Sequence, residues 1–324
     1  MTDRLRMVLL GAGGIRSQHL PGLARLGRTQ PVGVLCRTME SAEATTREWG
    51  GTAYTSLGQM LEEQRPEVAW VCLPPYSTGW ACEQLAEREI PFLVEKPLDA
   101  GGEKPVCIAE LVRRKSLVTA VGYNWRALDF LLAVQERLAE RPPHLLVARW
   151  IGDTPAAGWW RQREKSGGQI VEQATHQFDL ARVLLGEGTV IEARASQHPR
   201  AAYPDADVDD VTTALVGFES GALGSFSATC LANSSLVEMD LVSDGLVTTI
   251  AQRGRWPSVR WSVTFDDGRK RRALWNRGDP YQAEDEAFLD AVESGDPGRV
   301  LCTYEDALKT DQLTRQVVAV AGAR

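Results

Sequence analysis

The sequence of 324 residues is poor in the side chains that build metal centres and disulfide frameworks. Its six cysteines contain no Cys-x-x-Cys pair and show no metal-ligand spacing with the four histidines, so we expect no metal site. Free thiols are typical of a reducing compartment, which predicts a cytoplasmic protein.

The sequence also lacks a basic charge balance and a long apolar run. The net charge of −7 gives no electrostatic footprint for nucleic acid or for an acidic membrane surface. No apolar run approaches the roughly 20 residues that span a bilayer. The run from Leu5 to Leu10 is too short for a signal peptide, and a glycine loop follows it. We therefore expect neither a nucleic-acid partner nor a membrane partner.

What is present is ordinary globular composition, with 44% hydrophobic and 24% charged residues. The length suits two domains of about 150 residues each. In the first 120 residues, short apolar runs alternate with helical stretches. Strands are predicted at 7–10, 32–35, 68–73, 90–94 and 117–121, and helices up to about 26 and at 56–63, 80–89 and 102–115. This alternation predicts a doubly wound parallel sheet.

The loop GAGGIR, residues 11–16, follows the first predicted strand and precedes a helix. It resembles the dinucleotide fingerprint GxGxxG. Gly11 would allow the tight turn, and Gly13 would let a pyrophosphate approach the backbone. The amides around Gly14 and Ile15 would meet the charge of that pyrophosphate at the helix N-terminus. Arg16 replaces the third glycine, which either weakens the packing of helix on strand or places a cation near the phosphates.

The end of the second predicted strand indicates which dinucleotide binds. An acidic residue there would bind the ribose 2′-hydroxyl of NAD, but the sequence reads Cys36-Arg37-Thr38, with no acid before Glu40. A planar guanidinium beside a hydroxyl suits a 2′-phosphate, so we expect NADP(H) in preference to NAD(H). In the alternative, Arg37 only stacks on the adenine of either cofactor.

Two more strand ends contribute to the expected cofactor crevice. The strand 68–73 ends at Leu73 and Pro74, where the Pro-Pro pair forces the chain to turn over the crevice. The strand 90–94 delivers Lys96, one of only six lysines against thirty arginines, to the edge where open α/β sheets bind ligands. Pro97 pushes Lys96 toward an extended backbone, and the Lys–Pro bond is a candidate for the cis form. A partly desolvated lysine there can hydrogen-bond a substrate oxygen; the alternative is a surface Glu-Lys pair that closes a strand.

After about residue 122 the pattern changes to a helix at 128–140 and a series of strands. The strands are predicted at 145–151, 190–197, 211–218, 222–230, 236–242, 246–251 and 259–265, with hairpin turns at 219–221 and 243–245. This pattern predicts a largely antiparallel sheet. Both faces of the strand 211–218 are rather apolar, so we expect one face to pack on helices and the other on a partner subunit. The alternative is a well-covered sheet in a monomer.

The stretch SGGQIVEQATHQFDL, residues 166–180, predicts a helix that continues to about Gly186. Glu172, His176 and Asp179 lie at i, i+4 and i+7, so a continuous helix would place them on one face. A histidine flanked by acids can accept a proton near neutral pH. The alternative is an exposed stripe on an ordinary amphipathic helix. A metal site is disfavoured because no third or fourth ligand is spaced to complete it.

The chain resembles the glucose–fructose oxidoreductase, inositol dehydrogenase and rhizopine-catabolism family, the Gfo/Idh/MocA family. The matching stretches are GAGGIRSQH, LVEKPLD, VGYNWR, GGQIVEQATHQFDLARVLLG and PYQAEDEAFLDAV, and the resemblance covers essentially the whole chain. It implies an α/β protein with an N-terminal Rossmann domain, residues 1–122. It also implies a C-terminal α+β domain, residues 123–324, with a large, mostly antiparallel open-faced sheet. The C-terminal helix is a candidate to pack back on the first domain.

The resemblance implies roles for the lysine and the histidine beside the nicotinamide. Carried over, His176 would take the proton from a substrate hydroxyl. Lys96 would hydrogen-bond the same oxygen while hydride leaves the carbon for nicotinamide C4. The family usually has aspartate four residues before the histidine; Glu172 here could still orient His176 or hold the substrate. Asp179 would be a ligand of a substrate hydroxyl.

The resemblance also implies further contacts with the cofactor. Glu95 and Asn124 would border its nicotinamide end, and Trp160 and Arg161 would cover that end. Thr78, where the family often has histidine, would contact the cofactor after the Pro-Pro turn.

The implied function is an NAD(P)-dependent oxidoreductase. It would act on a secondary hydroxyl or ketone of a sugar, a cyclitol or a related polyol, as a homodimer or homotetramer formed through the C-terminal sheet. The main alternative is a non-catalytic dinucleotide-sensing regulatory protein of the same fold. This alternative stays open because Glu172 stands where the family usually has aspartate. A third possibility is elimination or glycoside cleavage with transient oxidation, which would leave no net NADPH.

Overall fold

The computed structural model describes residues 4–254 and 257–322 of the chain, which form two compact units. The first unit combines residues 1–127 with 279–308, and the second combines residues 128–278 with 309–324. Our expected division lay after residue 122; in the structure, residues 123–127 and 279–308 group with the first unit.

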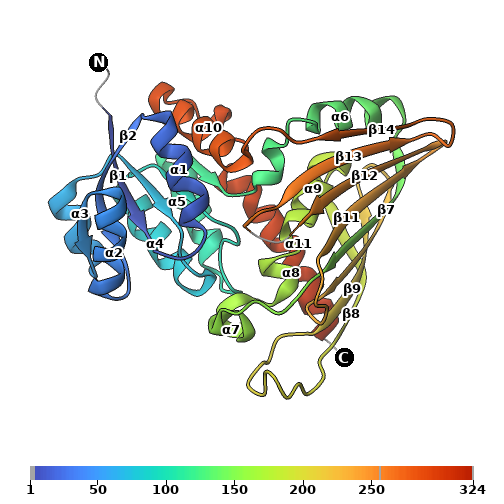
Figure 1. The fold of residues 1–324 in the computed structure, drawn as a ribbon, viewed down its shortest axis with the longest axis horizontal. Helices are drawn as coiled ribbons and strands as arrows, with labels where there is room; N and C mark the ends of the chain where they lie inside the picture. The colour runs from blue at the N-terminus through green and yellow to red at the C-terminus, as the bar shows by residue number, and fades with distance from the viewer. Residues whose placement is uncertain (1–3, 255–256, 323–324) are drawn as a thin grey trace. The chain divides into compact units, whose positions relative to one another are not determined.

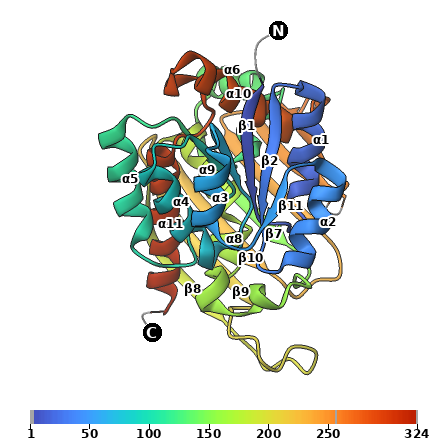
Figure 2. The ribbon, with the colours of Figure 1, turned by 90° about the vertical axis from the view of Figure 1, so that its left-hand side faces the viewer.

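The first unit is built on a six-stranded parallel sheet with the order β3-β2-β1-β4-β5-β6. Its strands are β1 (Leu5–Leu10), β2 (Thr29–Leu35), β3 (Thr52–Tyr54), β4 (Val68–Val71), β5 (Phe92–Val94) and β6 (Thr119–Val121). Its helices are α1 (Arg16–Leu26), α2 (Met39–Trp49), α3 (Leu57–Gln64), α4 (Pro75–Glu87), α5 (Lys104–Lys115) and α10 (Pro280–Ser294), with short 3₁₀ turns at Asn124–Ala127 and Pro297–Arg299. Helices α1 and α2 lie beside the strands β1 and β2 (Figure 2). The doubly wound parallel sheet predicted from the alternating pattern is confirmed.

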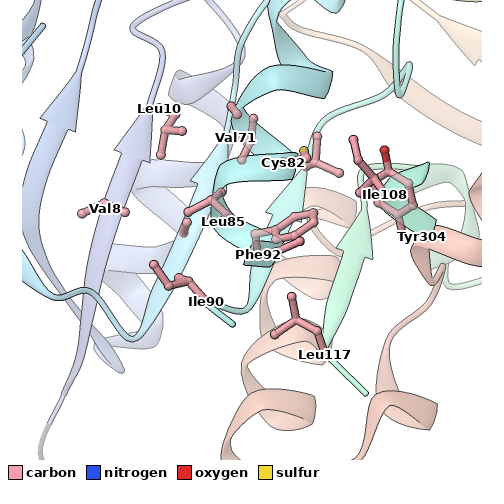
Figure 3. Packing of buried hydrophobic residues seen from close by; sticks show 14 of the residues in the cluster. Val8, Leu10, Val71, Cys82, Leu85, Ile90, Phe92, Ile108, Leu117 and Tyr304 are labelled. Carbon is pink, nitrogen blue, oxygen red and sulfur yellow. The ribbon is translucent and has the colours of Figure 1, made fainter. Parts of the chain in front are cut away.

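Both faces of this sheet are buried, which explains why its strands read as continuous apolar runs. On one face, Leu10 and Phe92 belong to a cluster with Tyr304, whose ring meets Phe92 edge-on at 6.1 Å between centroids (Figure 3). On the other face, Trp70 packs edge-on against Phe288 of α10 at 5.2 Å. Each apolar side chain buried in this way contributes roughly 1.5–3 kcal/mol, so α10 is an integral part of the first unit's core.

The second unit carries an eight-stranded sheet with the order β14-β13-β12-β11-β7-β10-β9-β8 (Figure 1). Its strands are β7 (Pro143–Ile151), β8 (Gly188–Ser196), β9 (Val211–Phe218), β10 (Leu223–Thr229), β11 (Leu236–Ser243), β12 (Leu246–Arg253), β13 (Arg260–Asp266) and β14 (Arg271–Trp275). Its helical segments are α6 (Leu131–Glu140), a 3₁₀ turn at Gly158–Arg161, α7 (Arg163–Ser166), α8 (Gln169–Glu172), α9 (Thr175–Leu185) and most of α11 (Tyr304–Gly322). Among the strands that the structure describes in this sheet, only the pair β7–β10 is parallel, so the predicted, mostly antiparallel sheet is confirmed.

Alternation along the strands separates the two faces of this sheet. In β9, Thr212, Ala214, Val216 and Phe218 are buried, whereas the residues between them are partly or fully exposed. The buried face packs on α9, where the ring of Phe178 stacks on Phe226 of β10 with the centroids 4.0 Å apart. Packing of this kind positions α9, and with it the residue His176, against the sheet.

Two predicted helices differ from the structure, and three elements were not predicted. The stretch 166–185 is not one helix: α8 ends at Glu172 and α9 begins at Thr175, because the amide of Ala174 bonds back to the carbonyl of Gln169 in a wider turn. Helix α4 begins at Pro75 rather than at residue 80, since proline suits the first turn of a helix. The prediction also missed α2, β3 and β14.

Candidate functional site

The candidate cofactor residues follow the carboxyl ends of the strands of the first unit. Because these strands are parallel, the loops after β1, β2, β4, β5 and β6 emerge at one edge of the sheet. The chain runs outward on one side through β1, β2 and β3, and on the other through β4, β5 and β6. The loops after β1 and β4 thus flank the switch point, where open α/β sheets bind ligands.

The glycine loop is tightly fixed at its first residue. Gly11 has φ +101°, and a Cβ there would lie 2.3 Å from the carbonyl oxygen of Cys72, so only glycine fits. Its amide donates to the carbonyl of Leu35 at 2.8 Å. Gly13 and Gly14 are exposed. The guanidinium of Arg16 donates to the carbonyls of Ala12 and Gly13. The arginine that replaces the third glycine of the fingerprint therefore stabilises the loop.

The residues at this edge fit a dinucleotide. Helix α1 begins at Arg16 with no side-chain cap among the described residues, and its first turn carries no acidic residue, so the positive end of its dipole suits a diphosphate. In the 3₁₀ turn after β6, the Oδ1 atom of Asn124 is buried and has no hydrogen-bond partner among the described residues. A carboxamide N–H of a nicotinamide is the kind of donor that would satisfy such an oxygen.

After β2, the three residues expected to select NADP(H) differ in exposure. Cys36 is buried, and burial raises the pKa of its thiol despite the nearby Arg16. Arg37 is exposed, and no ion pair of Arg37 is found in the described part of the chain. The hydroxyl of Thr38 caps α2 by accepting from the amide of Ser41 at 3.3 Å. That capping bond occupies one lone pair of the hydroxyl, so Arg37 is the main candidate for contact with a 2′-phosphate.

After β4, the chain turns directly into α4. Pro74 is the N-cap residue of α4, and Leu73 before it is half-buried. Thr78 is buried, and its hydroxyl donates to the carbonyl of Pro74 at 3.2 Å. Thr78 therefore stabilises the first turn of α4 next to the switch point.

After β5, Lys96 is half-buried between the buried residues Glu95 and Pro97, and the Lys96–Pro97 bond is cis. The amide of Glu95 donates to the carbonyl of Val71 in β4 at 2.9 Å. A Cβ on Gly122 would lie 2.9 Å from the carboxyl carbon of Glu95, so glycine at this position leaves the room that the carboxylate needs.

The carboxylate of Glu95 belongs to a buried cluster that sequence reasoning missed. The Nε2 atom of His19 lies 2.9 Å from Glu95, and the Nδ1 atom of His19 lies 2.8 Å from Asp285 of α10. The indole of Trp70 also donates to Asp285, at 2.8 Å. Burial alone would lower the pKa of His19, but the charge of Asp285 and the hydrogen bonds to Asp285 and Glu95 raise it well above its usual value. A carboxylate within hydrogen-bond distance of each ring nitrogen favours the imidazolium form of His19, which can donate to both.

A third acid, Glu284, completes this cluster. Burial and the nearby Glu95 raise the pKa of Glu284 well above its usual value, which favours its neutral carboxyl form. Ligand atoms of His19, Glu95 and Glu284 lie within 4.8 Å of one another, the spacing that a bound cation would require. Because each nitrogen of His19 already lies within hydrogen-bond distance of a carboxylate, we interpret the group as a hydrogen-bonded cluster.

In the second unit, a double-glycine turn brings the chain to His176. Gly167 and Gly168 have φ of +74° and +84°, values that other residues rarely adopt. His176 lies in the first turn of α9, is 9% exposed, and has its ring stacked on that of Trp150 of β7 at 6.3 Å. The side-chain amide of Gln177 donates to the carbonyls of Arg149 and Glu238. These two bonds fix the start of α9, and with it the backbone of His176, to two strands.

Glu172 is held by Trp160, the third residue of the 3₁₀ turn at Gly158–Arg161. The indole of Trp160 is 1% exposed and donates to the carboxylate of Glu172 at 2.8 Å. The structure thus brings together two residues that were predicted separately. The interruption of the helix after Glu172 removes the basis for placing Glu172 and His176 on one helical face.

Asp179 and Arg161 lie in different surroundings. Asp179 is fully buried and accepts from Thr310 of α11 at 2.9 Å, beside the guanidinium of Arg182, so it links α9 to α11. The guanidinium of Arg161 lies 4.9 Å from the ring of Tyr203. The ligand role expected for Asp179 and the covering role expected for Arg161 remain predictions.

Two family models match the chain. Residues 5–123 match the model described as the oxidoreductase family with an NAD-binding Rossmann fold, and residues 142–244 match the GFO/IDH/MocA C-terminal domain. The chain belongs to the GFO/IDH/MocA oxidoreductase family. Its cofactor is therefore a nicotinamide dinucleotide, and the chain is an NAD(P)-dependent oxidoreductase of this family.

Relatives of this GFO/IDH/MocA protein are distant in sequence. Inositol 2-dehydrogenase of Rhizobium meliloti is 24% identical over 298 residues, which cover 90% of this chain and 89% of the relative. Levoglucosan dehydrogenase of Pseudarthrobacter phenanthrenivorans is 23% identical over 220 residues, covering 58% of this chain and 56% of the relative.

A solved structure shares the fold along nearly the whole chain. It is a 3-ketoreductase from Actinomadura kijaniata in complex with NADP and TDP-benzene, with a TM-score of 0.86, 17% identity and 98% coverage of both chains. At this identity, the likeness shows the fold alone.

Within residues 4–254 and 257–322, the helices are too short or too polar to span a bilayer.

Proposed function

We propose that this protein catalyses reversible hydride transfer between NADP(H) and a secondary hydroxyl or ketone of a sugar, cyclitol or related polyol. The observation that carries the proposal is the place of Lys96. It is half-buried, follows β5 directly after the buried Glu95, and shares its sheet edge with the glycine loop. An ammonium at that edge is placed to bind an oxygen beside a dinucleotide.

The proposed roles follow from the chemistry of the two candidate groups. His176 accepts the proton of the substrate hydroxyl, and the ammonium of Lys96 donates a hydrogen bond to the same oxygen, which stabilises the negative charge that develops there. The nicotinamide supplies the hydride acceptor at C4. Glu172, held by Trp160, orients the substrate or the imidazole. Glu95 and Asn124 border the nicotinamide end, and Arg37 binds the 2′-phosphate.

The proposed substrate class rests on the chemistry of the relatives. Inositol and levoglucosan, named in the two curated relatives, are small polyols with secondary hydroxyls. Other structures of this fold are described as a 3-ketoreductase bound to TDP-benzene and a UDP-N-acetylglucosamine 3-dehydrogenase from Acidithiobacillus ferrooxidans. Free polyols and nucleotide sugars are therefore the two groups of compounds to test.

The test is a screen of both compound groups with NADP+ and NAD+, followed by Lys96→Ala and His176→Ala on the best substrate. We expect either substitution to lower kcat/KM about 100- to 10,000-fold, the usual contribution of a positioned acid or base. The matched controls are Lys104→Ala and His144→Ala, since both of these side chains are exposed, and they should keep wild-type turnover.

The outcome also separates this proposal from the alternatives. If both variants turn over substrate like the wild type, the assigned roles are wrong. Tight dinucleotide binding without turnover of any compound would favour a sensing protein. Product formation without net NADPH would favour elimination or glycoside cleavage with transient oxidation.

We also propose that two copies of the chain associate through the open face of the second unit's sheet. Leu145, Leu223, Val242 and Val247 are paired across four neighbouring strands. Leu145, Leu223 and Val247 of this row are 37–47% exposed. A row of this kind favours a second copy of the same sheet, because a sheet face can pair with its own symmetry mate.

A further inference from the structure

His19 connects two parts of the first unit that carry candidate chemistry. It lies one turn into α1, the helix that follows the glycine loop, and it is fully buried. Its Nε2 atom donates to Glu95, the residue directly before Lys96. The imidazolium is therefore a rigid bridge between the start of the cofactor-binding helix and the turn that holds Lys96.

The surroundings of this bridge keep it in one arrangement. Asp285 holds the other nitrogen of His19, and Trp70 in turn holds Asp285. Gly122 lies against the Glu95 carboxylate, so close that a Cβ there would be 2.9 Å from its carboxyl carbon. The ring of Tyr281 meets that of His19 edge-on at 5.6 Å. A side chain confined in this way by charge and by packing has a single rotamer, which is what precise placement of a neighbouring group requires.

We propose that His19 is a positioning residue for Lys96, acting through Glu95 to fix the ammonium relative to the helix that binds the cofactor. This inference rests on the proposed function, because it assigns Lys96 to the reacting oxygen. His19 itself touches neither cofactor nor substrate in this account. Asp285 of α10 holds the other nitrogen of His19. Its effect on Lys96 therefore passes through one more hydrogen bond than that of His19.

The first experiment compares His19→Gln with Leu23→Ala in the full chain. Leu23 is a buried core residue on the same helix, so Leu23→Ala lowers stability without removing the bond to Glu95. For His19→Gln we expect a fall in kcat of about 10- to 100-fold, since a 1 Å misplacement of a reacting group costs up to about 100-fold. The Kd for NADP+ should change by less than about threefold. The deuterium isotope effect with 4-deuterated NADPH should rise as hydride transfer becomes rate-limiting.

A second variant covers the case in which His19→Gln does not fold. Asp285→Asn keeps the shape of the side chain and leaves the bond between His19 and Glu95 in place, so kcat should fall, but by less than in His19→Gln. If the folded His19 and Asp285 variants keep the kcat and the isotope effect of Leu23→Ala, His19 has only a structural role and the inference is overturned.

A second measurement does not depend on turnover. Trace acetylation of the wild type, His19→Gln and Leu23→Ala, followed by peptide mass spectrometry, gives the reactivity of Lys96 relative to the other five lysines. We expect that ratio to change at least about threefold in His19→Gln and to stay unchanged in Leu23→Ala. An unchanged ratio in His19→Gln contradicts the positioning role, whether or not a substrate has been found.

A stoichiometric divalent metal in the purified protein would also contradict the positioning role, because Nε2 of His19 would then be a ligand rather than a donor. A wild type without activity on any substrate would count against the proposed function, and the acetylation ratio would still decide the role of His19.

Discussion

Replacing Glu172 by aspartate, the residue that the family resemblance leads one to expect, should harm this protein. The carboxylate of Glu172 accepts the indole N–H of Trp160 at 2.8 Å, and Trp160 is 1% exposed. Aspartate is one methylene shorter, so its carboxylate would retreat by about 1.5 Å and leave the indole N–H without this acceptor. A hydrogen bond to a charged group contributes about 1.5–3 kcal/mol. Glu172→Asp should therefore lower the unfolding transition of the second unit by about 3–12 °C.

Calorimetry of the full chain measures this effect, and kcat/KM measures its consequence for the site. If Glu172 orients His176 or the substrate, kcat/KM should fall about tenfold or more, which corresponds to about 1.4 kcal/mol. The matched control is Glu164→Asp, which makes the same change at an exposed position of α7. Trp160→Phe removes the donor instead, and the double variant should be no less stable than the worse single variant, because both remove the same bond. A Glu172→Asp protein as stable as Glu164→Asp, or more active than the wild type, would refute this reasoning.

Two more predictions concern the cofactor and the assembly. Arg37→Ala should raise the Kd for NADP+ about 10- to 150-fold, since it removes a charge-assisted contact with a phosphate, and should leave the Kd for NAD+ nearly unchanged. Isothermal titration with Arg47→Ala, an exposed arginine of α2, serves as the control, and a wild-type preference for NAD+ would contradict the role of Arg37. The pair Leu145→Asp and Leu223→Asp should turn an oligomer into a monomer in sedimentation equilibrium, because it places charges in the exposed apolar row. The control Leu132→Asp changes an exposed residue of α6 and should keep the wild-type mass; a monomeric wild type would rule out the proposed association.

The spacing of apolar residues predicted the helices and strands well wherever a segment followed one clear periodicity, that of a strand or that of a helix. The strand at 211–218 matches β9 at both ends, and the helix predicted at 56–63 matches α3, which the hydroxyl of Ser56 caps by accepting from the amide of Gln59. The same patterns could not show the break after Glu172, because apolar residues at helical spacing read alike with or without a wider turn between them. The short strands β3 and β14 were missed because three and five residues carry too little alternation to stand out.

Two features of the candidate site could be predicted because a single residue type dictates the local backbone conformation. Pro97 indicated the special geometry at Lys96, and the bond before it is cis. Gly11 indicated the tight turn after β1, where a side chain would overlap with Cys72. The buried cluster gave no such signal: His19 lies 76 positions from Glu95 and 266 positions from Asp285. Contacts over such separations depend on which helix returns to which face of the sheet, and spacing in the sequence does not record that.

The return of α10 to the first unit makes the nucleotide-binding half depend on a late segment of the chain. Helix α10 supplies Asp285 to His19, and it places Phe288 on Trp70 in the core. Arg28, at the end of the turn after α1, pairs with both Asp290 and Glu293 of the same helix, although such partly exposed pairs contribute little each. A chain that ended at residue 127 would leave His19 with one carboxylate instead of two and would uncover Trp70, on which Phe288 packs. The match of residues 5–123 to a Rossmann family model therefore marks the part of the unit that is continuous in sequence, whereas the folded unit that holds Lys96 in place also requires residues 279–308.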